Sequence, residues 1–188
     1  MESTMGILDT QFAYQQGVQG KVRIDVIDVK NVSDFALNKW LEEWILPEVP
    51  AKALNPFREP GRILQTVYSS NLIVATGRAY LGLILKGSTP SPTDIAVGTS
   101  STAADDADTT LGTEVFRDNI TQRINITNGA RIRFLLSSTS ANGNSLAEAG
   151  IFGPSPSLYL LSRVTYSPIN KTPSVAVNYT WDITFTQP

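Results

Sequence analysis

The chain has 188 residues, enough to bury the core of one domain of ordinary size together with an appended segment. Its formal net charge is −2, from 15 basic and 17 acidic residues, so it lacks the broad positive field that direct nucleic-acid binding requires. It contains no cysteine and no histidine, which excludes disulfides, thiolate or imidazole metal sites, cysteine nucleophiles and serine–histidine triads.

Residues 1–60 are predicted to form an extended N-terminal arm, one strand, one short helix and a proline-rich connector. Residues 1–20 show no consistent period and neither the basic start nor the apolar run of a signal peptide. No run in the chain approaches the roughly 18 apolar residues of a membrane span, so we expect no membrane partner. Residues 21–29 begin by alternating polar with β-branched side chains, the pattern of a strand with one buried face. The apolar side chains of this alternation are Val22, Ile24 and Val26.

A short amphipathic helix is predicted from Asp34, where apolar residues begin to recur at steps of three and four. Pro47 ends it, because proline lacks the N–H donor and disfavours a helical residue before it. The apolar face consists of Leu37, Trp40, Leu41, Trp44 and Ile45. Two tryptophans one turn apart form a large apolar patch, so we predict that this face and strand 21–29 bind the partner protein. The alternative is that the helix covers the open end of the chain's own sheet.

Residues 61–188 are predicted to fold alone as an antiparallel β-domain. Strand patterns follow one another with turn-rich segments between them and no helical crossovers, which favours a β-sandwich or jelly-roll. The predicted strands are 62–69, 72–86, 113–127, 130–139, 146–152, 158–166 and 175–186. The chain is therefore expected to be mainly β, with one short helix in its N-terminal part.

Five carboxylates lie between residues 94 and 114 among small, uncharged side chains. Asp105, Asp106 and Asp108 lack the alternating ligand spacing and terminal Glu of an EF-hand loop, which leaves calcium in an irregular loop as the alternative. We interpret the stretch as a hydrated or partner-covered loop and expect neither metal nor cofactor. Replacing the three aspartates by Asn is then expected to change stability by no more than about 0.5 kcal/mol.

A second acidic position, Glu148, stands among small and apolar residues in the predicted strand 146–152. An unpaired buried carboxylate is costly, so Glu148 is expected to be paired. Arg163, in the neighbouring predicted strand, is the candidate partner. We interpret the two as a structural ion pair rather than as part of a catalytic site.

Five motifs in the second half of the chain stand in a fixed order: 95–99, 108–111 with Glu114, 146–152, 161–172 and 179–185. As a set they resemble small structural proteins of tailed double-stranded DNA bacteriophages. The resemblance covers roughly residues 90–188 and does not extend to residues 1–60. It implies a β-rich component of the virion, assembled in the cytoplasm of a bacterial host, with a structural rather than an enzymatic role.

Three functions remain open. The first is a capsid decoration, or cement, protein that binds the major capsid protein and its own copies as a homo-oligomer, for which we expect a trimer. The second is a tail, baseplate or fibre module that contacts host glycan. The third is a hydrolase with two opposed carboxylates, whose spacing across a cleft cannot be read from a sequence. We predict the first, with no enzymatic activity.

Overall fold

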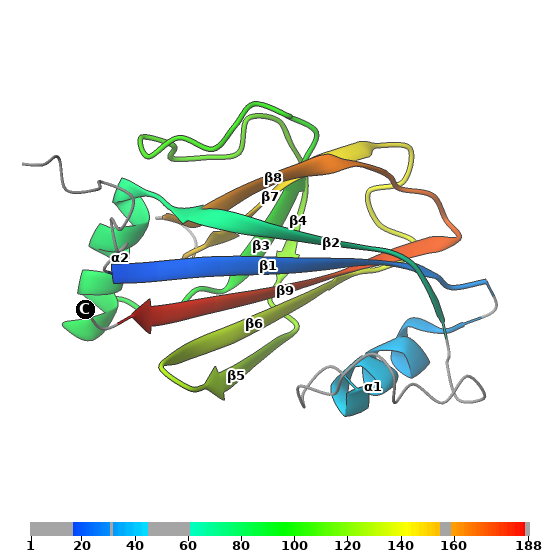
Figure 1. Ribbon diagram of the computed structural model, residues 1–188, viewed down its shortest axis with the longest axis horizontal. Helices are drawn as coiled ribbons and strands as arrows, with labels where there is room; N and C mark the ends of the chain where they lie inside the picture. The colour runs from blue at the N-terminus through cyan, green and yellow to red at the C-terminus, as the bar shows by residue number, and fades with distance from the viewer. Residues whose placement is uncertain (1–16, 31, 45–60, 155–158, 187–188) are drawn as a thin grey trace, which may run out of the picture.

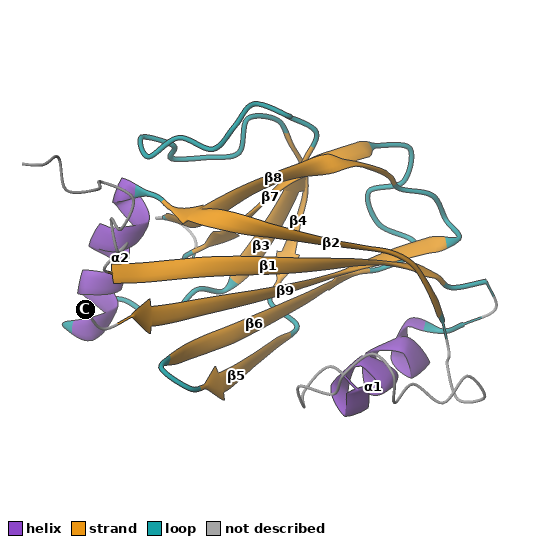
Figure 2. Ribbon diagram, viewed as in Figure 1, coloured by secondary structure: helices purple, strands orange, loops and turns teal. Residues whose placement is uncertain are grey.

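The computed structural model describes residues 17–30, 32–44, 61–154 and 159–186 (Figure 1). These residues form nine strands and two helices, so the chain is mainly β as predicted (Figure 2). The strands are β1 (Gly17–Asp28), β2 (Arg62–Ile73), β3 (Asp94–Gly98), β4 (Glu114–Asn119), β5 (Gln122–Ile126), β6 (Gly129–Leu136), β7 (Ser145–Phe152), β8 (Leu160–Asn170) and β9 (Val175–Thr186). The helices are α1 (Asp34–Trp44) and α2 (Ala75–Leu85).

All nine strands belong to one antiparallel sheet, in the order β4-β3-β7-β8-β2-β1-β9-β6-β5. The sheet curls, and apolar side chains from β1, β6 and β9 share one core with side chains from β3, β7 and β8. Stacked aromatic rings of Tyr179 and Trp181 lie within this core. β1, β6 and β9 alternate apolar with other residues, whereas β3 and β7 are buried on both faces. The curl therefore encloses apolar side chains from both halves of the sheet.

The predicted boundary near residue 60 runs through the sheet. β1 lies in the middle of the sheet, paired with β2 on one side and with β9 on the other. Without β1, the segment 61–188 would have two further unpaired strand edges. That this segment folds alone stays a prediction. The predicted arm covers residues 1–20, and its residues 17–20 belong to β1, so the prediction is wrong for them. Residues 1–16 and the proline-rich connector lie outside the described residues.

Helix α1 packs against the chain's own sheet. Leu37, Trp40 and Leu41 are buried in a second apolar cluster with Ile27 of β1 and Ala176 of β9. Ser33 begins the helix, since its Oγ accepts the N–H of Ala36 at 3.2 Å. The prediction that this face binds a partner is corrected for these three side chains, which the sheet already covers.

The predicted binding strand is also internal. Val22, Ile24 and Val26 are buried in the main core, and both edges of β1 carry strand partners. A strand with both edges paired cannot add to another sheet, so these residues are core residues and not contact residues. Trp44 lies at the end of α1, and its side chain lies outside the described residues.

Helix α2 was not predicted. The segment 72–86 was interpreted as a strand, but β2 ends at Ile73 and α2 begins at Ala75. Its run of apolar residues fits a buried strand or a buried helix equally, so periodicity does not separate the two. Gly77 decides the packing, because it lies directly against the backbone oxygen of Leu161 in β8. Neither of the described helices is long and apolar enough to span a membrane.

Candidate functional site: the loop held by Glu148 and Arg163

Residues 99–113 form a long loop between β3 and β4 and carry mostly exposed side chains. In Figure 1 this loop is the green segment that projects beyond the strands at the top. Both of its ends, and its middle, are bound to charged side chains that come from β7 and β8. The loop is therefore exposed and yet closely held.

Glu148 of β7 holds the two ends of the loop. The side chain is fully buried, and its Oε1 accepts the N–H of Ser100 at 3.2 Å and that of Thr113 at 2.7 Å. Its Oε2 accepts the N–H of Gly112 at 2.9 Å. One carboxylate thus accepts hydrogen bonds from three backbone N–H groups, which in most loops would bind water instead.

Arg163 of β8 completes the anchor. Its Nη2 lies 2.8 Å from Glu148 Oε2, so the structure brings together the two side chains that the sequence paired. Its Nη1 lies 2.7 Å from Asp108 Oδ2, and its Nη2 donates to the carbonyl oxygen of Thr102 at 3.1 Å. Arg163 is 3% exposed, and the pairing of β7 with β8 places it beside Glu148.

The charges of this network stabilise one another. Burial works against ionisation of Asp108, but hydrogen bonds from the N–H of Asp105 and from Arg163 outweigh it and lower the pKa of Asp108. Burial alone would lower the pKa of Arg163. The hydrogen bonds and negative charges of Asp108 and Glu148 outweigh the effect of burial, so the pKa of Arg163 is raised. Asp108 and Arg163 therefore both keep their charges at neutral pH.

A further contact fixes the loop to α2. Asp106 and Arg78 form a two-point ion pair, with separations of 2.7 and 2.8 Å, and this hydrogen bond lowers the pKa of Asp106. The carbonyl oxygen of Asp106 accepts the N–H of Ala75, the first residue of α2, at 2.9 Å. The loop therefore supplies a hydrogen-bond acceptor that the start of the helix needs.

The three aspartates have different roles, which corrects the prediction that all three are dispensable. Asp108 faces the buried Arg163, whereas Asp106 faces the half-exposed Arg78 and Asp105 accepts only the N–H of Ala107 with its side chain. In the part of the chain that the structure describes, no three acidic side chains are grouped so that they could hold a metal ion.

Asp108→Asn is expected to lower the free energy of unfolding by about 1–2 kcal/mol, because it removes the charge that faces Arg163. Asp105→Asn is the matched control and is expected to stay within about 0.5 kcal/mol, since Asn accepts the same N–H. Urea unfolding at pH 7 measures both. Because the folded pKa of Asp108 is lowered, its contribution is present above about pH 4 and is lost as the pH falls through the folded value. Equal losses in the two variants would contradict this assignment.

Comparisons with protein-family models, curated proteins and solved structures found no match for this chain. Four of the five motifs from which a phage structural protein is predicted lie at the anchored loop or on the strands that hold it: 95–99, 108–111, 146–152 and 161–172. Sequence reasoning paired Glu148 with Arg163 and singled out Asp108 in the acidic stretch, but it did not predict that Asp108 binds Arg163. The likeness to phage proteins stays a prediction.

Proposed function

We propose that the chain is a non-enzymatic structural protein of a tailed-phage virion, a capsid decoration protein that binds the major capsid protein and its own copies. The observation that carries this proposal is the loop 99–113, which is exposed but held by Glu148, Arg163 and Arg78. A held loop loses little conformational entropy when it binds, and loops on rigid scaffolds are common contact surfaces.

The burial of Glu148 supports a structural role over hydrolysis. Its side chain has no exposed surface, and both carboxylate oxygens accept hydrogen bonds from the protein. A catalytic carboxylate has to reach its substrate, whereas an anchoring one has to be satisfied inside. The β-sandwich or jelly-roll architecture belongs to the same proposal, and the core shared by both halves of the curled sheet supports it.

Immunogold labelling of purified virions, with antibodies against the recombinant protein, tests the location. We expect label over the capsid surface. Label confined to the tail, baseplate or fibres would assign the chain to the second candidate, a tail module. Intact virions without label at any position would contradict a structural role in the particle.

Charge added at the tip of the loop is expected to reduce occupancy on particles. Ala107 and Thr109 are exposed, so Ala107→Arg with Thr109→Arg places two bulky cations in the proposed contact without touching the core. We expect occupancy to fall by about tenfold or more, as for the loss of one strong contact, while the melting temperature is unchanged. Thr172→Arg, at another exposed position, is the control. Wild-type occupancy of the loop variant would exclude the loop as the contact.

A further inference from the structure

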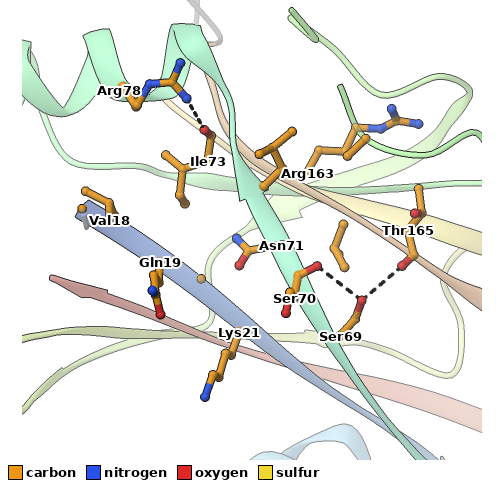
Figure 3. A pocket seen from close by; sticks show the side chains of 15 residues that line it. Val18, Gln19, Lys21, Ser69, Ser70, Asn71, Ile73, Arg78, Arg163 and Thr165 are labelled. Atoms are coloured by element: carbon orange, nitrogen blue, oxygen red, sulfur yellow. Dashed lines mark hydrogen bonds between the residues drawn. The ribbon is translucent and has the colours of Figure 1, made fainter. Parts of the chain in front are cut away.

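A cavity of about 670 Å³ opens where β2 leaves β1 and joins β8 (Figure 3). β2 is paired with β1 up to Asn71, and with β8 at Leu72 and Ile73. The change of neighbour separates the strands at this point, and the cavity lies between residues 17–21, 69–73 and 163–165. Its volume falls within the range of roughly 300–1,000 Å³ that small-molecule sites occupy.

The side chain of Asn71 lies between β1 and β2 in this cavity (Figure 3). The residue is 8% exposed, and neither its Nδ2 nor its Oδ1 has a hydrogen-bond partner among the residues that the structure describes. Gly20 lies opposite, and any side chain there would collide with the amide. A buried amide without partners is rare in native proteins and requires an explanation.

The two arginines of the lining already bind carboxylates. Arg78 binds Asp106, and Arg163 binds Glu148 and Asp108. Lys21 is exposed to solvent. The polar groups that remain for a ligand are uncharged: the Asn71 amide and the hydroxyl groups of Ser69, Ser70 and Thr165. The weak contacts of Ser69 Oγ, at 3.4 Å to two carbonyl oxygens, leave that hydroxyl available.

We propose that this cavity binds a short neutral saccharide. An amide offers one acceptor and two N–H donors, and adjacent sugar hydroxyl groups both donate and accept, so they match Asn71 and the serines. An uncharged ligand suits a lining whose two arginines already bind carboxylates, since a charged ligand would lose hydration inside the cavity without an unpaired arginine to bind it. Gly17 and Ala104 add little side-chain bulk to the lining, and the space beside the Gly17 Cα is open. This proposal does not rest on the proposed role as a capsid decoration protein.

Titration of the full-length protein with maltotriose, cellotriose and chitotriose tests the proposal. We expect at least one of them to bind with a millimolar or lower Kd and to shift the NMR signals of the Asn71 side-chain amide. Asn71→Leu keeps the size of the side chain and removes the amide, so it is expected to lower affinity about tenfold or more. Ser69→Ala with Ser70→Ala is a second variant that carries little risk to folding. Asn125→Leu, at an exposed position of β5, is the matched control.

Three results would overturn the proposal. The first is that none of the three sugars binds at millimolar concentration. The second is that a sugar binds equally well to wild-type protein, to Asn71→Leu and to the double serine variant, which places it elsewhere. The third is that trigalacturonate or trialanine binds at Asn71 while the neutral sugars do not, which makes the cavity an anion or peptide site. Virion labelling is independent of these measurements, so either proposal can fail alone.

Discussion

Replacing Glu148 by Ala is expected to lower the free energy of unfolding by about 3–5 kcal/mol, the usual cost of leaving a buried charge without its partner. Arg163 remains at 3% exposure with only Asp108 as a counter-charge. The backbone N–H groups of Ser100, Gly112 and Thr113 lose their acceptor in the same change. Urea unfolding measures the loss of stability, and limited proteolysis is expected to cut the released loop 99–113 first.

Two further variants separate the buried network from an ordinary ion pair. Glu114→Gln removes a carboxylate that binds Arg117 nearer the surface, and it is expected to cost no more than about 1 kcal/mol. Glu148→Leu combined with Arg163→Met removes both buried charges, so it is expected to recover part of the stability lost in Glu148→Ala. A loss below about 1 kcal/mol in Glu148→Ala would show that the network does not anchor the loop.

Gly77→Ala is expected to destabilise the fold by about 2–3 kcal/mol, because a methyl group at this position meets the backbone oxygen of Leu161. A backbone atom within a strand cannot move aside as a flexible side chain can. The helix therefore has to move away from β8, where Tyr80 is also buried in the main core. Thermal or urea unfolding measures the effect.

Gly82→Ala is the matched control on the same helix. A methyl group at Gly82 meets nothing within 4 Å, and alanine is favoured over glycine inside a helix by about 0.8–1 kcal/mol. The two identical substitutions are therefore expected to change stability in opposite directions. Destabilisation by both, or stabilisation by both, would contradict the close packing of α2 on β8.

Local sequence patterns were sufficient to predict the strands and helices that have one apolar and one polar face. The strand predicted at 175–186 is β9, whose alternating residues Val177, Tyr179 and Trp181 lie in the main core. The three- and four-residue steps of Leu37, Trp40 and Leu41 predicted α1. These patterns depend on each residue's own chain neighbours, so they can be recognised without knowledge of the fold.

Glu148 and Arg163 could be paired from the sequence. Burying an unpaired carboxylate costs much free energy, so a cationic partner from a neighbouring strand was expected. The roles of Asp108, Gly112 and Thr113 could not be found in the same way. Their contacts with Glu148 and Arg163 span 35 to 55 residues of chain, and they exist only because β3, β7 and β8 are adjacent in the sheet.

By itself, the sequence determined a mainly β chain, the helical pattern of α1 and the need for a partner to Glu148, since periodicity and the cost of burying charge act locally. Only the tertiary structure decided the place of β1 between β2 and β9, because strand pairing joins segments far apart in the chain. It likewise decided that 75–85 is a helix, because the contact of Gly77 with β8 selects between two structures that the same apolar run permits. The apolar side chains of α1 and β1 that were predicted to bind a partner are buried in the chain's own core. This burial also depends on contacts between segments far apart in the chain.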